Sequence, residues 1–185
     1  MKHLFNKYRS VLKFLLFFLG SYLIFSLIYG GYLTLSKRNS NTADSITQLV
    51  AKQSSDVLNS LGYDAQVLAN EGLPTMQLWV EGEQVGRIVE GCNAVSILIL
   101  FAAFIIAFSF STKRTLLYLF AGGVLIYGIN IIRIVILAIT LYRYPQYQEF
   151  LHGVIFPGII YGFVFLLWVI WVRYVVRFKQ MISYE

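Results

Sequence analysis

The sequence is poor in charge, cysteine, histidine and proline. Its 185 residues include nine acidic residues, one cysteine, two histidines and three prolines. One cysteine cannot form a disulfide within the chain, and one cysteine with two widely separated histidines cannot supply the ligands of a zinc site. The sequence also has no Gly-x-Ser-x-Gly motif and no glycine-rich phosphate loop. We therefore predict no metal and no cofactor.

The scarcity of charge indicates membrane helices. Three long apolar runs have no charged residue, and a fourth contains only Arg133. A helix needs about 20 such residues to cross about 30 Å of hydrocarbon. We predict an α-helical integral membrane protein with four transmembrane helices, over residues 14–35, 93–112, 115–142 and 152–172. The first run is too long for a signal peptide and has no small-x-small cleavage site, so we predict a retained anchor.

Lysine and arginine are unevenly distributed between the connecting segments. With a cytoplasmic N-terminus, nine of the fifteen basic residues fall on short cytoplasmic segments and eight of the nine acidic residues fall outside. The positive-inside rule then places residues 1–13, 113–114 and 173–185 in the cytoplasm, and residues 36–92 and 143–151 outside. The net charge of +6 reflects this topology, so we predict membrane lipid and no nucleic acid as a partner.

Residues 36–92 are predicted to form a small extracytoplasmic α+β insertion between the first two membrane helices. The stretch "TADSITQLVAKQSSDVLNSLG" predicts a helix that ends near Gly62. Its predicted apolar face consists of Ile46, Leu49, Val50, Val57, Leu58 and Leu61. The stretches "YDAQVLA", "LPTMQLWV" and "VGRIVE" predict three short strands, and the last one leads directly to Cys92.

Three residues at the predicted outer ends of different membrane helices have unusual chemistry for their positions. Cys92, in "EGCNAVS", is an unpaired thiol at a predicted helix start, where free N–H groups favour a thiolate. Arg133, in "GINIIRIVIL", is a charge in a membrane helix, which costs at least about 2–3 kcal/mol and normally faces a protein interior. His152 stands in "QEFLHGVIF". Together they supply a nucleophile, an oxyanion partner and a proton-transfer group.

Each of these residues also has an ordinary interpretation. A free cysteine is usually a small buried hydrophobic residue, an arginine can extend toward lipid headgroups, and a single interfacial histidine is often incidental. On that interpretation the chain is a non-enzymatic membrane scaffold or assembly factor that binds a partner through its external segment. A small channel with Arg133 as an anion site is disfavoured, because four helices with one charge form a meagre pathway. The shared face of all three residues favours a catalytic site.

The order of these motifs resembles the exosortase/archaeosortase family, most closely its short exosortase F-like branch in Bacteroidetes. A strand leads into Glu-x-Cys, Asn-x-x-Arg follows in the next helix, and His begins another helix. Members are integral-membrane cysteine proteases, proposed to act as transpeptidases on proteins whose C-terminal sorting signal is a short motif, a membrane helix and a basic tail. The resemblance covers about residues 85–172. It departs at Asn93–Ala94, where many members have Ser-Gly, and many members have more helices.

The resemblance implies a role for each residue. Cys92 is the expected nucleophile, His152 the catalytic histidine and Arg133 the conserved arginine, while Glu90 and Asn130 are candidates for orienting His152 or Arg133. It implies a transpeptidase that transfers exported proteins to an acceptor molecule, in the bacterial inner (cytoplasmic) membrane, with its site facing the periplasm or cell exterior. The resemblance leaves open the substrate, its motif and the choice between transfer and hydrolysis. It also leaves open whether the protein acts as a homo-oligomer or with a partner subunit.

Overall fold

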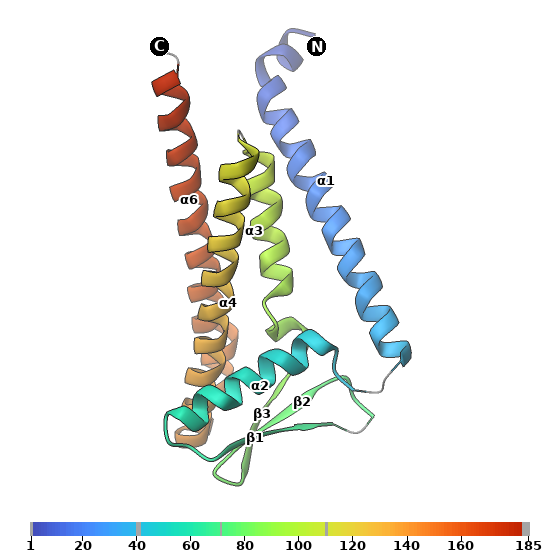
Figure 1. Ribbon diagram of the computed structural model, residues 1–185, viewed down its shortest axis with the longest axis vertical. Helices are drawn as coiled ribbons and strands as arrows, with labels where there is room; N and C mark the ends of the chain where they lie inside the picture. Colours follow the sequence, from blue (N-terminus) through green and yellow to red (C-terminus); the bar gives the residue numbers. More distant parts are fainter. Residues whose placement is uncertain (1, 40–41, 71, 110, 183–185) are drawn as a thin grey trace.

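The computed structural model describes residues 2–39, 42–70, 72–109 and 111–182, with the backbone alone for residues 2–7, 10, 39, 148, 152 and 178–182. Long helices stand beside one another above a small helix-and-sheet unit (Figure 1). The elements in chain order are α1 (Lys2–Asn39), α2 (Ser45–Ser60), β1 (Ala65–Ala69), β2 (Met76–Val80), β3 (Glu83–Ile88), the 3-10 turn η1 (Glu90–Cys92), α3 (Val95–Ala107), α4 (Thr112–Arg143), the 3-10 turn η2 (Pro145–Tyr147), α5 (Gln148–Phe150), the π-helical turn η3 (Leu151–Ile155) and α6 (Phe156–Ile182).

Three of the described helices are long and apolar enough to cross a membrane. The candidate spans are Val11–Arg38, Thr112–Arg143 and Gly153–Arg177. Helix α3, which falls in the predicted span 93–112, has only 13 residues. At 1.5 Å per residue it is about 20 Å long, which is shorter than about 30 Å of hydrocarbon. The protein is therefore a mostly helical, multi-pass membrane protein with three candidate spans, and a fourth span through α3 stays a prediction.

Helix α3 is short because local structure fixes both of its ends. Ala94 has a left-handed backbone with φ 65°, which an α-helix cannot continue through. Asn93 Oδ1 accepts a hydrogen bond from the Val95 N–H at 3.0 Å and satisfies one of the free donors of the first turn. At the other end Phe108, with φ −98° and ψ 17°, leaves the helical conformation. Apolar composition alone does not reveal these two stops.

The predicted α+β insertion is present and is called the cap here; it comprises α2 and the sheet β1–β3. The strands are antiparallel in the order β1-β2-β3, with Ala65 opposite Val80 and Met76 opposite Ile88. Helix α2 lies across the sheet on the side of the long helices (Figure 1). Within the described residues, β1 and β3 are therefore the two edge strands.

The buried face of α2 differs from the predicted one. Leu49, Val57 and Leu61 were expected on it, but they are 51%, 37% and 57% exposed. Ser55 is buried and its hydroxyl donates to the Ala65 carbonyl at 2.8 Å. Small and hydroxyl side chains let α2 lie close to the sheet. Hydrophobicity alone therefore predicts the wrong buried face for this helix. The buried residues of α2 are Thr47, Val50, Ala51, Ser54, Ser55 and Leu58.

The buried apolar side chains form two separate clusters, and α4 contributes to both. With its 32 residues α4 is about 48 Å long, so it exceeds the thickness of the hydrocarbon layer. The cap core joins the cap to the C-terminal part of α4, through Ile131, Ile134, Val135 and Ala138. The membrane core joins α3, α4 and α6, through Ala94, Phe101, Ile105, Ile126, Val164, Leu167, Trp171 and Val175.

Candidate active site

The boundary between the two cores passes through two buried asparagines. Asn93 stands between Cys92, which packs against the cap core, and Ala94, which belongs to the membrane core. On α4, Asn130 directly precedes Ile131 of the cap core. Both asparagine side chains are 1% exposed. Because a buried amide needs hydrogen-bond partners, the bonds of these two residues determine the structure around Cys92.

Cys92 is held by its backbone and does not begin a helix as predicted. It ends the turn η1, three residues before α3 starts, because the left-handed Ala94 separates the two. Its N–H donates to the Val89 carbonyl at 2.8 Å. Its carbonyl accepts from Asn130 Nδ2 at 2.8 Å. Both backbone groups of Cys92 are therefore fixed.

Asn130 donates a hydrogen bond to Cys92, and its expected role in orienting His152 or Arg133 stays a prediction. Its Nδ2 is used by the Cys92 carbonyl, and its Oδ1 is buried without a hydrogen-bond partner in the described part of the chain. The shared helix face of Asn130 and Arg133 was visible from their spacing. The contact with Cys92 was not, because it depends on how α3 and α4 pack.

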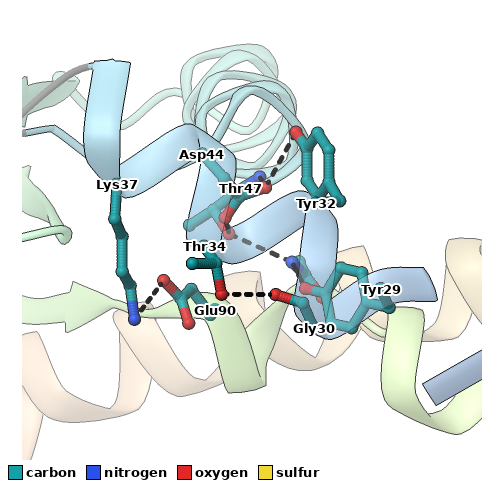
Figure 2. Close-up of polar contacts among 9 residues, drawn as sticks. Tyr29, Gly30, Tyr32, Thr34, Lys37, Asp44, Thr47 and Glu90 are labelled. Carbon is teal, nitrogen blue, oxygen red and sulfur yellow. Dashed lines mark hydrogen bonds and ion pairs between the residues drawn. The ribbon is translucent and has the colours of Figure 1, made fainter. Parts of the chain in front are cut away.

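Asn93 ties the segment that carries Cys92 to α1 and α2. Its Nδ2 donates to Tyr29 Oη at 2.7 Å and to Thr47 Oγ1 at 3.1 Å. Asp44, the N-cap of α2, accepts from the Thr47 N–H at 3.1 Å and from the Tyr32 hydroxyl at 3.5 Å. Figure 2 shows the rings of Tyr29 and Tyr32, both from α1, to the right of Asp44 and Thr47. Three helices thus meet at one buried polar cluster next to the thiol.

Glu90 is paired with the end of α1. Its carboxylate lies 3.2 Å from Lys37 Nζ (Figure 2). In the described chain Glu90 has no hydrogen bond or ion pair with Arg133. Its expected role toward His152 stays a prediction, because that side chain is outside the described residues. The ion pair fastens the turn η1, which ends at Cys92, to α1.

Cys92 and Arg133 line the same pocket, which has a volume of about 420 Å³. The Nε of Arg133 is buried without a hydrogen-bond partner among the described residues. Arg87 of β3 also lines the pocket, and within the described chain neither arginine has an ion pair. Since the described lining contains no acidic residue, the pocket is positively charged. Arg87 was predicted only as part of a strand, because nothing in the sequence connects it with Cys92.

Helix rise gives the distance of this pocket from the basic start of α4. Phe14 of α1 contacts Phe108 at the end of α3, with ring centroids 4.4 Å apart, so Lys13 and the start of α4 lie at the same end of the bundle. Arg133 is twenty residues beyond Lys113 on α4, which is about 30 Å, the thickness of the hydrocarbon. The rest of α4 packs against the cap. Arg133 is therefore about one hydrocarbon thickness from the basic start of α4, inside the candidate span Thr112–Arg143.

His152 lies in the π-helical turn η3 at the start of α6. Its side chain is outside the described residues, so its predicted proximity to Cys92 stays a prediction. His152 is four residues before Phe156, the first residue of α6, which belongs to the buried side chains of that helix.

These features define a multi-pass helical membrane protein with a thiol and a guanidinium in one pocket. The family model described as transmembrane exosortase matches residues 4–172. The chain therefore belongs to the transmembrane exosortase family, and the resemblance noted in its sequence is confirmed. This family is generally one of cysteine peptidases or transpeptidases that process sorting signals. Comparison with curated proteins and with solved structures gives no match.

Proposed function

We propose that the protein is a membrane-embedded cysteine endopeptidase that cleaves the C-terminal sorting signals of exported proteins and transfers the proteins to an acceptor. One observation carries the proposal: Cys92 and Arg133, from different elements, line a single positively charged pocket. The buried bond from Asn130 to the Cys92 carbonyl supports it, because it fixes the backbone of the nucleophile at 2.8 Å from a rigid helix. Family membership gives the same reaction class.

In the proposed reaction the Cys92 thiolate attacks the carbonyl carbon of the scissile peptide bond. Arg133 stabilises the negative charge that develops on the carbonyl oxygen. The carbon–nitrogen bond then breaks, His152 donates a proton to the leaving amine, and a thioester to Cys92 remains. An acceptor amine or hydroxyl attacks the thioester, gives its proton to His152 and releases the thiolate. With water as the acceptor, the same step is hydrolysis.

The position of the pocket suits a substrate anchored in the same membrane. A sorting signal consists of a short motif followed by a membrane helix, so its cleavage point lies at the edge of the bilayer. Arg133 is about 30 Å along α4 from the basic start of this helix. This distance equals the thickness of the hydrocarbon layer, so the proposal puts Arg133 at the edge opposite the basic start of α4. In this proposal α3 is the fourth span, both termini are cytoplasmic, and the cap and the pocket face the periplasm or cell exterior of a bacterial inner membrane.

The decisive experiment replaces Cys92 by alanine in cells and identifies membrane proteins by mass spectrometry of their C-terminal peptides. Loss of the nucleophile should leave the substrate proteins with their C-terminal helix uncut. Ser96→Ala is a matched control, because Ser96 is an exposed residue of the neighbouring α3. Unchanged processing in Cys92→Ala cells would reject the peptidase and favour a scaffold that binds a partner through the cap.

A further inference from the structure

The pocket beside Cys92 runs along the edge of a strand. Its lining includes residues 84–88 of β3, five in succession. Side chains of a strand alternate between its two faces, so a pocket against one face would be lined by every second residue. A bulge at Val85, between the pairs Leu78–Gly86 and Trp79–Gln84, interrupts this alternation, but the regular residues 86–88 beyond it still line the pocket in succession. Lining by consecutive residues indicates that the pocket follows the backbone at the strand edge. In the described chain β3 pairs only with β2, so its other edge has no strand partner.

The opposite wall of the pocket is one face of α4. The residues of α4 that line it are spaced i, i+1, i+4, i+5 and i+8, as expected for one helix face. They cover about 12 Å along the helix axis, while residues 84–88 cover about 13 Å of strand. The two walls therefore match an extended segment of about four residues. The α4 residues are Arg133, Ile134, Leu137, Ala138 and Leu141.

Gly86 keeps this groove open. It lies in the middle of β3, opposite Leu78, and both residues line the groove. A Cβ added at Gly86 would have no heavy atom within 4 Å, so packing within the chain does not require a glycine. Glycine also weakens a strand interior, and it often marks a place where another backbone approaches closely.

The position of Cys92 fixes the direction of a bound segment. Strand β3 runs toward the boundary between the two cores and reaches Cys92 through η1, while α4 runs the opposite way from Arg133 to Leu141. Cys92 and Arg133 are therefore at the membrane end of the groove, and Gln84 and Leu141 are at its outer end. A substrate with a C-terminal membrane helix has its exported part outside. Its chain must run from the outer end to Cys92, in the same direction as β3.

We propose that the residues preceding the scissile bond bind in this groove as an added strand, parallel to β3. Their main-chain groups pair with the free N–H and C=O groups of the β3 edge, and α4 covers their side chains. This inference rests on the proposed function, because it describes how the substrate of Cys92 is held. Recognition through the main chain brings the scissile carbonyl to the thiol, and side-chain contacts with Arg87 and α4 then select among sequences.

A series of peptide electrophiles tests the proposal on the full chain in lipid nanodiscs. The probes are methyl vinyl sulfone and acetyl-alanine peptides of one to five residues that end in a vinyl sulfone, and the rate of Cys92 modification is measured by mass spectrometry. The rate should rise about tenfold up to four residues and then level off, since two to three main-chain hydrogen bonds have about this effect. N-methylation should remove the gain at every second amide, because only alternate residues of an added strand pair with β3.

Gly86→Val fills the groove with a residue that strands favour, and Ala69→Val makes a matched change on the other edge strand, β1. The ratio of peptide rate to methyl vinyl sulfone rate should fall about tenfold in Gly86→Val and stay unchanged in Ala69→Val. If Cys92 reacts fast but the rate ratio does not depend on peptide length or N-methylation, the added strand is overturned and the proposed function stays intact. If Cys92 reacts slowly with every probe and Arg133→Gln does not change its rate, both are overturned. The N-methylated peptides test the added strand on the parent protein, so the test holds even if Gly86→Val does not fold.

Discussion

The cap core and the membrane core are packed from similar side chains but are held together by different forces. The cap core lies where water surrounds the protein, so each buried side chain gains from its removal from water. The membrane core lies among lipid tails that are as apolar as leucine, so only close packing and hydrogen bonds favour association. The membrane core accordingly contains interlocked aromatic rings, such as Trp171 beside Tyr118 with centroids 4.7 Å apart. The boundary between the two cores therefore joins two regions that are stabilised in different ways.

Polar groups can be held rigidly at this boundary. Asn93 and Asn130 are buried there and anchor the segment of Cys92 to three helices. Arg133 lines the groove at the same level, so apolar side chains do not enclose its charge on every side. Helix α4 runs through both cores and positions Asn130 and Arg133 in relation to each other. The candidate site therefore lies where one helix passes from the membrane core into the cap core.

The largest expected effect compares one truncation in the two cores. Leu58→Ala in α2 removes a fully buried side chain and should lower cap stability by about 2–5 kcal/mol. Leu167→Ala in α6, where the leucine is 7% exposed, should cost less, because lipid solvates the apolar surface and only the packing loss remains. Hydrogen exchange of α2 and α6 amides in nanodiscs measures both. Equal losses would mean that the two cores are held by the same force.

Much of the fold could be predicted because its causes are local. The absence of charge predicts the long helices, and short stretches with apolar residues between turn residues predict the three strands. The start of α3 after Asn93 and Ala94 could not be predicted. The buried capping side chain of Asn93 and the left-handed backbone of Ala94 both depend on tertiary contacts. The same holds for the α2 face, where Ser55 is buried because the sheet accepts its hydrogen bond.

The candidate site could be predicted only in part, for a similar reason. Cys92 and Arg133 stand out because a lone thiol and a charge in apolar sequence are rare. Glu90 also stood out, but its partner Lys37 is on a helix far away in sequence. Gly86 gave no signal, because a glycine in a strand gains meaning only when the space beside it is known.

A second, smaller effect concerns the charge at the core boundary. Arg133→Gln should lower the cleavage rate of the substrates found in Cys92→Ala cells about a hundredfold, because one oxyanion partner is lost. The substitution should also slow labelling of Cys92 by thiol reagents, and so should His152→Gln. Arg143→Gln is a matched control on the same helix, since Arg143 is exposed and donates to the Tyr63 hydroxyl at 2.9 Å outside the pocket. Labelling no faster than that of a free thiol, and indifferent to these changes, would mark Cys92 as inert.

The smallest effect tests the backbone that separates Cys92 from α3. Ala94 has φ 65°, a conformation that costs an L-residue about 1–2 kcal/mol and a glycine almost nothing. Ala94→Gly gains that relief but loses a buried methyl group and adds freedom to the unfolded chain, each worth somewhat under about 1 kcal/mol. We expect its stability to stay within about 1 kcal/mol of the parent, in keeping with the Ser-Gly that many family members have here.

The same substitution at Ala103 gives the contrast. Ala103 is fully buried in the interior of α3, so Ala103→Gly adds the helix penalty of about 1 kcal/mol to the lost methyl contact and has no strain to relieve. Thermal unfolding in nanodiscs should therefore rank Ala94→Gly at or near the parent and Ala103→Gly clearly below it. If the two variants lose the same stability, residue 94 does not have the left-handed backbone, and α3 can begin at Cys92. The thiol would then stand at the end of a longer membrane helix, and the boundary between the cores would no longer separate it from α3.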